Sequence, residues 1–243
     1  MKTNFAIVTP LANEGSEFAP FVKEVTEVLN ELGCGTCYFV VDKVSTDNTL
    51  DLCQELSERD PRFITVWAPQ NRNVVQAYMQ GYKVALDAGH DFIIEMDAGL
   101  SHDPRALPLF LSALQAGYQC AYGSRFMKGG SISDSSSRRS ILSRAGTLLS
   151  RVLLGLKLHD ATSGFQGFDR ATVAKFLNYQ LLSEAHFFHV ELRYLLREKK
   201  HIEIPIHYRA PSPRVSYKVV SNSVDTLLHY FKLRLLGKSP IIN

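Results

Sequence analysis

Short apolar runs that each end in a polar turn alternate with amphipathic stretches through the first half of the chain. Four of these runs are typical of buried strands: 5–9, 38–41, 63–67 and 92–96. The stretches between them carry apolar residues at helical spacing. Strands that alternate with helices are typical of an α/β fold built on a single, mostly parallel sheet. We therefore predict one such domain over 1–220 and a C-terminal amphipathic helix and tail over 221–243.

Two helix starts are indicated by residue type. Ser16 could cap the helix after the first strand, and Gly33 would end that helix. Asp103-Pro104 is typical of the start of a helix after the fourth strand. Both helices would then follow a strand through a short polar turn.

The fourth apolar run leads directly into a carboxylate, Asp97, and then into the turn Ala98-Gly99-Leu100-Ser101-His102. In an open α/β sheet, ligands bind at the carboxyl ends of central strands. A carboxylate held there can bind a hard cation, which in turn binds phosphate oxygens. The alternative is that Asp97 only begins a turn.

Short motifs along the chain match one family in order. The segment 96–104 resembles the Asp-Ala-Asp-Leu-Ser-His-Pro-Pro segment of family 2 glycosyltransferases, in the branch of the dolichyl-phosphate mannose synthases. The other matching motifs are Pro10-x-x-Asn13-Glu14, Asp42-x-x-Ser45-x-Asp47-x-Thr49, Gly123-Ser124-Arg125, Thr162-Ser163-Gly164-Phe165 and Ile204-Pro205-Ile206 with Arg209. The resemblance implies a GT-A fold and an inverting transfer of a hexose from a nucleotide sugar to a polyprenyl phosphate.

The resemblance also implies which residues form the site. It places the donor against Pro10, Asn13, Glu14, Asp42, Lys43, Asp97 and Ala98, with Asp97 and Ser101 facing Mg²⁺ or Mn²⁺. It places the acceptor phosphate against Arg125, Arg138, Arg139, Ser163, Gly164 and Lys218. Asp97 and Arg125 are the expected catalytic residues. A phosphate acceptor has its second pKa near ~6, so it needs no strong general base.

Some of these positions keep a second interpretation. Arginine pairs such as Arg138-Arg139 make good bidentate phosphate clamps, but they are also typical of a solvated helix start. Asp160 could contact the sugar or cap a turn. The stretch 129–137 is rich in glycine and serine and is either a mobile active-site loop or a plain surface loop.

The departures from the family motifs cluster on the donor and metal side. They are Ala12, Lys43, Val44, Asn73, Val75 and Gly99, the last in place of the second aspartate of the metal motif. Either the donor base or the metal use has changed, or catalysis has been lost. Magnesium can keep several waters and few protein ligands, so one carboxylate does not forbid it. Alternatively, Arg125, Arg138 or Lys218 could neutralise the diphosphate directly.

Two basic and apolar segments, 140–158 and 224–236, could lie in a membrane interface, whereas core packing or a homodimer contact is the alternative for each. No apolar run approaches the length of about eighteen residues that a membrane-spanning helix needs. We therefore expect a cytoplasmic protein that associates peripherally with the cytoplasmic face of a membrane.

Composition narrows the function classes. The net charge is +3 and no basic stripe carries interleaved aromatics, so a nucleic-acid partner is not expected. The four cysteines, Cys34, Cys37, Cys53 and Cys120, lack a second pair at zinc-site spacing and are expected to be reduced thiols.

Two rival functions stay open. The first is an enzyme of the same fold with a soluble or polysaccharide acceptor, which would need a carboxylate base that the sequence does not single out. The second is a catalytically silent relative that binds a ligand or partner. Gly99 and Lys43 favour the silent relative, whereas Arg125 and the segment 162–165 favour an enzyme.

Overall fold

A seven-stranded sheet forms the centre of the computed structural model, which describes residues 4–133, 137–209 and 217–243, without the side chains of 137–139 and 217–218. Its strands are β1 (Phe5–Leu11), β2 (Thr36–Val41), β3 (Phe63–Trp67), β4 (Phe92–Glu95), β5 (Cys120–Ser124), β7 (Gln166–Asp169) and β8 (His201–Pro205). Their order is β3-β2-β1-β4-β7-β5-β8, and β7 alone runs antiparallel to its neighbours. The predicted α/β fold with a mostly parallel sheet is confirmed. A separate small sheet pairs β6 (Ser131–Ile132) with β9 (His207–Tyr208).

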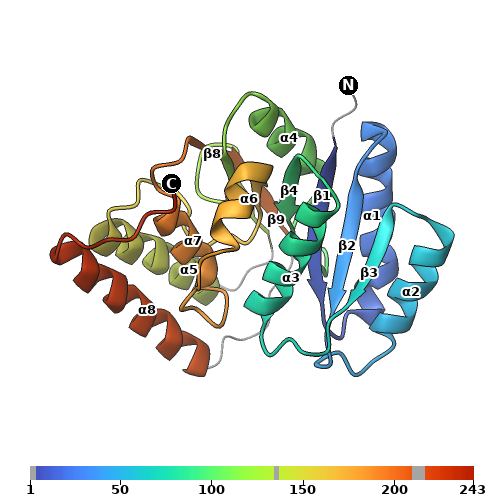
Figure 1. Ribbon diagram of the computed structural model, residues 1–243, viewed down its shortest axis with the longest axis horizontal. Helices are drawn as coiled ribbons and strands as arrows, with labels where there is room; N and C mark the ends of the chain where they lie inside the picture. The colour runs from blue at the N-terminus through green and yellow to red at the C-terminus, as the bar shows by residue number, and fades with distance from the viewer. Residues whose placement is uncertain (1–3, 134–136, 210–216) are drawn as a thin grey trace.

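Helices cover both faces of the central sheet (Figure 1). One face carries α1 (Gly15–Leu32), α2 (Thr49–Arg59) and α4 (Leu107–Gln115), the last preceded by the 3₁₀ turn η1 (Pro104–Ala106). The other face carries α3 (Val74–Asp87), α6 (Arg170–Phe176), α7 (Phe188–Leu195) and α8 (Tyr217–Leu235). The helix α5 (Ser137–Leu149) continues into the π-helical turn η2 (Ser150–Leu154).

The central strands are apolar on both faces because both faces are covered. In β1, Phe5 and Ile7 pack into the core beneath α1, whereas Ala6 and Val8 pack into the core beneath α3. Successive side chains of a strand point to opposite faces, so a strand between two helical layers must be apolar throughout. This is why the strands appear in the sequence as continuous apolar runs.

The predicted cap at Ser16 is wrong. The helix α1 begins at Gly15 with Glu14 at the N-cap, and no side chain of the cap residue bonds to the first turn. Instead, the N–H of Gly15 donates to Oδ2 of Asp47, at 3.0 Å, from the turn after β2. By contrast, Asp103 does cap η1, because its carboxylate accepts from the N–H of Arg105 at 3.0 Å.

The C-terminal helix packs on the rest of the molecule. The side chains of Leu227 and Tyr230 are buried, and the hydroxyl of Tyr230 donates to Oε1 of Glu191 at 2.7 Å. Further on, the N–H of Ile242 donates to the carbonyl oxygen of Leu195 at 2.9 Å. The division of the chain at 220/221 stays a prediction. In the described part of the chain, no helix combines the length and the apolar character needed to cross a bilayer.

All four cysteines are free thiols. Cys37, Cys53 and Cys120 are buried, and burial raises the pKa of Cys53 and of Cys120 to about 12. Thiols with such values stay protonated at neutral pH and react slowly. The expectation of reduced cysteines agrees with this arrangement.

Candidate active site

The polar turns of the sequence gather at one edge of the sheet. Because β1, β2, β4 and β5 all point the same way, the residues that follow them lie at a common edge. The segment before β7 reaches the same edge, since β7 runs in the opposite direction. This is the edge at which ligands bind in open α/β sheets.

The turns after β1 and β2 are joined by hydrogen bonds. Asn13 adopts a positive φ of 59°, and its Oδ1 accepts from the N–H of Thr46 at 2.9 Å. The N–H of Glu14 donates to Oγ1 of Thr49 at 2.9 Å. The Asp47 carboxylate accepts from Thr49, Gly15 and Ser45, and these bonds lower its pKa to about 2. The backbone of the predicted donor turn is therefore fixed by the neighbouring turn.

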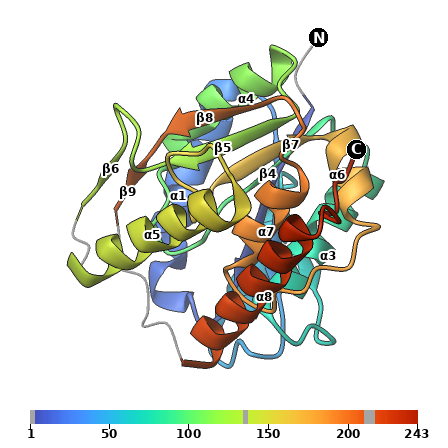
Figure 2. The ribbon, with the colours of Figure 1, turned by 90° about the vertical axis from the view of Figure 1, so that its left-hand side faces the viewer.

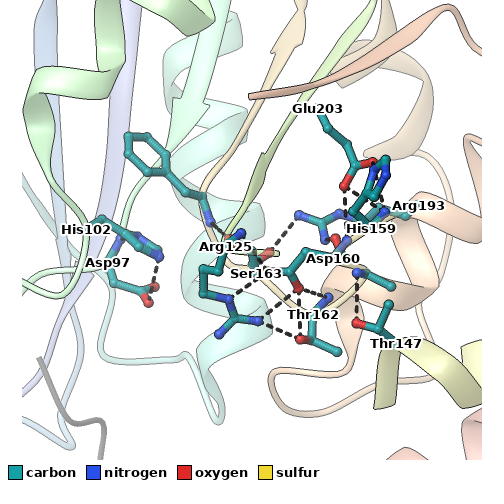
Figure 3. A network of polar contacts seen from close by, with 12 residues as sticks. Asp97, His102, Arg125, Thr147, His159, Asp160, Thr162, Ser163, Arg193 and Glu203 are labelled. Atoms are coloured by element: carbon teal, nitrogen blue, oxygen red, sulfur yellow. Dashed lines mark hydrogen bonds and ion pairs between the residues drawn. The ribbon is translucent and has the colours of Figure 1, made fainter. Parts of the chain in front are cut away.

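Asp97 is held from two sides at the end of β4. The Tyr78 hydroxyl of α3 donates to its Oδ1 at 2.6 Å. The N–H of Asp97 donates to Nδ1 of His102 at 3.0 Å, so the proton of a neutral His102 must be on Nε2. That nitrogen lies 3.7 Å from Oδ2 of Asp97. Figure 3 shows the imidazole and the carboxylate side by side.

Electrostatics keep this pair in defined protonation states. Burial lowers the pKa of His102 to about 4; Arg125 and His189 act in the same direction and Asp97 acts against it. Burial alone would raise the pKa of Asp97, but the attraction of His102 and the hydrogen bond from Tyr78 outweigh it and lower that pKa. At neutral pH, Asp97 is therefore an anion beside a neutral imidazole.

Glu14 brings a second carboxylate close to the Asp97 turn. A Cβ built at Gly99 would lie 3.0 Å from Oε2 of Glu14, and Gly99 itself has a positive φ of 71°. Burial raises the pKa of Glu14, and the negative charges of Asp97, Glu17 and Asp47 raise it further. The carboxylate of Glu14 thus stands where a side chain at position 99 would begin.

These residues fit a divalent cation with few protein ligands. Within the described residues, no group of three or more His, Cys, Asp or Glu side chains is arranged to hold a metal. However, Asp97 is 34% exposed and Glu14 is half-buried, so both carboxylates are open to a ligand on one side. Hard oxygen donors suit Mg²⁺ and Mn²⁺, which complete their coordination with waters and phosphate oxygens.

A buried ion pair lies across from Asp97. Nε and Nη2 of Arg125 donate to the Asp160 carboxylate at 2.6 and 2.9 Å, and Nη2 also donates to Oγ1 of Thr162 at 2.7 Å. Arg125 is 6% exposed and Asp160 is not exposed at all. Burial alone would raise the pKa of Asp160, but the hydrogen bonds and charge of Arg125 outweigh it and lower that pKa. Oδ1 of Asp160 also accepts from the N–H of Thr162 at 3.1 Å, so Asp160 caps a turn, as one of its two interpretations held, and pairs with Arg125.

A second buried arginine supports the segment 160–164 from behind. Nη1 of Arg193 donates to the carbonyl oxygen of Asp160 and Nη2 to that of Ser163, both at 2.7 Å. Its side chain is 1% exposed and comes from α7 (Figure 3). Because carbonyl groups at fixed positions accept these bonds, Arg193 sets the path of the segment.

The other end of this segment touches Asp97. A Cβ at Gly164 would lie 3.4 Å from Oδ1 of Asp97 and 3.3 Å from Nε2 of His189. His189 in turn contacts the buried carboxylate of Glu95, which also accepts from Tyr82 at 2.6 Å. A side chain at this position would press on the His189 ring, and glycine avoids that contact. The Nε2 of His189 is thus paired with the carboxylate of Glu95.

The structure thus brings most of the predicted site residues to one edge of the sheet. The residues at this edge are Pro10, Asn13, Glu14, Asp42, Lys43, Asp97, Ala98, Ser101, Arg125, Ser163 and Gly164. The backbone of Arg138 and Arg139 lies in α5 and that of Lys218 in α8, but their side chains fall outside the described part. Residues 134–136 of the predicted loop also fall outside it.

Sequence reasoning missed three residues that hold the site: Tyr78, Glu95 and Arg193. Tyr78 lies on an apolar face of α3 and gives no sign in sequence of its carboxylate partner. Glu95 is a charged residue inside an apolar strand, which is the one signal that could have indicated a buried pair.

Residues 6–177 match the family model described as glycosyl transferase family 2. The chain belongs to this family. The resemblance inferred from the short motifs is confirmed, and so are the GT-A fold and glycosyltransferase activity as the function class.

Two characterised members of the family are similar over most of the chain. The polyprenol monophosphomannose synthase of Mycolicibacterium smegmatis is 33% identical over 82% of this chain and 76% of its own. The undecaprenyl-phosphate mannosyltransferase of Micrococcus luteus is 30% identical over 70% of each chain.

A solved structure supports the fold. Glucosyl-3-phosphoglycerate synthase from Mycobacterium tuberculosis, in complex with Mn²⁺, UDP-glucose and phosphoglyceric acid, has a TM-score of 0.67 and 16% identity over 97% of this chain and 80% of its own.

Loss of the Asp160 charge should destabilise the protein strongly. In the variant Asp160→Asn, the Arg125 guanidinium stays buried without its counter-charge, so we expect the free energy of unfolding to fall by about 3–5 kcal/mol. Urea denaturation at pH 7 measures this change. The control Asp87→Asn breaks the exposed pair of Lys83 and Asp87, and should cost about 1 kcal/mol or less. Equal losses in the two variants would contradict the assignment.

His102 should make stability depend on pH. Its pKa is about 4 in the folded protein against 6.5 in the unfolded chain, so the unfolded state binds the proton first. The contribution is complete above pH 6.5 and is lost as the pH falls toward 4. Between pH 7 and 4.5 we expect wild type to lose about 2–3 kcal/mol more unfolding free energy than His102→Asn. The exposed His229→Asn variant, measured in the same urea titrations, should follow wild type.

Proposed function

We propose that the protein transfers a hexose, with mannose as the first candidate, from a nucleotide sugar to a polyprenyl phosphate at a membrane surface. The observation that carries the proposal is the similarity to two enzymes whose names specify polyprenol or undecaprenyl phosphate and mannose. The geometry of the helices beside Arg125 supports the same acceptor class.

The helix α5 lies directly against the segment that holds Arg125. The N–H of Ala161 donates to Oγ1 of Thr147 at 3.2 Å, and a Cβ at Gly146 would lie 3.2 Å from Cγ2 of Thr162. The guanidinium of Arg144 stacks over the Phe126 ring at 4.4 Å. A molecule bound along α5 would therefore lie close to the part of the site that contains Arg125.

Apolar side chains are exposed on α5, on η2, and on α8 and the residue that follows it; we call this set the helical patch. Its members are Ile141, Leu142, Leu148, Leu149, Val152, Val224, Leu228, Leu235 and Leu236, each at least 46% exposed. The helices lie on the same side of the molecule, and Arg234 of α8 donates to the carbonyl oxygen of Leu153 at 2.8 Å (Figure 2). Large exposed apolar patches mark interaction sites, and neighbouring basic residues favour an anionic lipid surface.

The chemistry needs no base from the protein. A phosphate monoester acceptor has its second pKa near ~6 and is largely dianionic at pH 7, so it can attack the sugar without losing a proton. The chain must orient this anion and stabilise the diphosphate that leaves. A divalent cation held by Asp97 and Glu14 would neutralise that diphosphate. Arg125 is paired with Asp160, which offsets its positive charge. The net charge that this pair presents to a phosphate is therefore smaller than that of a free arginine.

An assay of sugar transfer to two different acceptors tests the proposed function. The protein is incubated with labelled GDP-mannose, UDP-glucose or UDP-galactose and either undecaprenyl phosphate in detergent or 3-phosphoglycerate. We expect label in the lipid phase with one donor, at least about tenfold less with Asp97→Asn, because that carboxylate is needed to stabilise charge in the transition state. Transfer to 3-phosphoglycerate alone would replace the lipid acceptor with a soluble one. No transfer by any pair would contradict the proposed function and favour a silent relative.

The helical patch should bind vesicles. Val152 of η2 is a member of the patch and is 65% exposed, so Val152→Asp adds a charge to the proposed membrane face without disturbing the core. In co-sedimentation with vesicles of phosphatidylcholine and phosphatidylglycerol, we expect this variant to bind several-fold more weakly than wild type. The control Leu109→Asp changes a side chain that is 49% exposed on α4, outside the patch, and should bind as wild type does. Equal binding by all three proteins would exclude the patch as the contact.

A further inference from the structure

The helix α7 is buried on every side and still carries three polar side chains that can bear a charge. All eight of its residues are buried, and His189, Glu191 and Arg193 stand at every second position. An α-helix turns by about 100° per residue, so residues i and i+4 share a face whereas residue i+2 lies on the opposite side. His189 and Arg193 therefore lie on one side of α7, and Glu191 lies on the other.

The side of α7 with His189 and Arg193 faces the candidate active site. Nη2 of Arg193 donates to the carbonyl oxygen of Ser163 at 2.7 Å. The ring of His189 borders Gly164, where a Cβ would lie 3.3 Å from Nε2 of His189 and 3.4 Å from Oδ1 of Asp97. The position of α7 thus decides where Ser163 and Gly164 stand relative to Asp97.

The opposite side of α7 is fixed through Glu191, whose side chain is completely buried. Its Oε1 accepts from the N–H of Leu182 and from the hydroxyl of Tyr230, both at 2.7 Å, and its Oε2 accepts from the N–H of Ser183 at 2.9 Å. Among the described residues, no lysine, arginine or histidine forms an ion pair with this carboxylate. Hydrogen bonds from a loop and from α8 therefore offset the burial of this acidic group.

Tyr230 connects α8 to this arrangement. Its side chain is 1% exposed, and burial together with the charge of Glu191 raises its pKa, so the hydroxyl stays protonated and donates. Val224 and Leu228 of the same helix are exposed members of the helical patch. The helix α7 thus lies between α8 and the sheet (Figure 1), with a polar contact on each side.

We propose that Tyr230 and Glu191 are positioning residues of the transfer reaction. Their hydrogen bond fixes α7 from the side of α8, and α7 in turn holds Ser163 and Gly164 beside Asp97. Both residues are buried, so neither contacts a bound substrate, and their effect is on the alignment of the site. The inference rests on the proposed function for the reaction that is measured.

The test compares two variants that each lose one buried hydroxyl. Tyr230→Phe keeps the ring and removes the donor to Glu191. The control Tyr194→Phe removes a hydroxyl that donates to Oγ of Ser239 at 2.7 Å. Tyr194 is also 1% exposed and lies on α7, but its partner belongs to the C-terminal tail and not to Glu191. The two variants therefore match in the kind of bond that is lost.

Initial rates are measured with labelled GDP-mannose and undecaprenyl phosphate in detergent, well below the melting temperature of each protein. We expect kcat of Tyr230→Phe to fall by about fivefold or more, because a small displacement of the reacting groups slows the chemical step. The KM for GDP-mannose should stay within about twofold of wild type, since donor binding is not affected. Tyr194→Phe should keep both constants. A loss of stability alone would not lower kcat under these conditions.

Hydrogen exchange of the protein without substrate tests the same contact apart from the reaction. We expect Tyr230→Phe to speed amide exchange both at 182–183 and at 160–165, whereas Tyr194→Phe leaves 160–165 unchanged.

Three outcomes would overturn the inference: equal kcat in wild type and Tyr230→Phe, an equal fall in both variants, or unchanged exchange at 160–165 in Tyr230→Phe. If wild type transfers no sugar, the proposed function fails, and the exchange at 160–165 decides separately whether Tyr230 positions that segment.

Discussion

The ion pair between Arg125 and Asp160 is the contact on which the rest of the site depends. Asp160 is not exposed and Arg125 is only 6% exposed, so each charge is tolerable only because the other is present. The pair joins the end of β5 to the segment before β7, whose Gly164 borders Asp97 and whose Ala161 bonds to α5. A single buried contact thus links three parts of the site: the turn that carries Asp97, the end of β5 that carries Arg125, and the helix α5. Arg193 reinforces it from α7 by bonding to two carbonyl oxygens of the same segment.

Much of the fold was predictable because it follows from local patterns. Covered strands must be apolar on both faces, and this made β1 to β4 visible as runs bounded by polar turns. The position of Asp97 at the carboxyl edge followed from the parallel topology, whereas Arg125 was placed by the resemblance to the family. Partners were harder to predict. Nothing near Asp160 in sequence indicates Arg125, and nothing near Tyr78 indicates Asp97, because each pair is formed only when distant segments meet. The cap at Ser16 failed for the same reason, since Asp47 comes from another turn.

Each departure from the family motifs, taken alone, removes a side chain that the motif would supply. In the structure, one of these departures, Gly99, also affects a neighbouring residue. Gly99 removes a carboxylate but also makes room for Glu14. Lys43 lies exposed on the turn after β2, where Asp42 accepts from the N–H of Val44 at 2.8 Å. Asp42, which matches the motif, therefore fixes the backbone of that turn beside the residues that depart from it.

The membrane contact proposed for the helical patch would have a consequence for kinetics. A protein seated on a bilayer through α5 and α8 meets a lipid acceptor by diffusion in two dimensions. Its rate is then governed by the number of acceptor molecules per unit of membrane area, and diluting the acceptor with other lipids slows it even when the amount in the suspension is unchanged. The N–H of Ala161 and the hydroxyl of Thr147 connect the seated helix to the segment beside Asp97. Lateral pressure in the lipid headgroups would therefore act on the same helix that borders the reaction site.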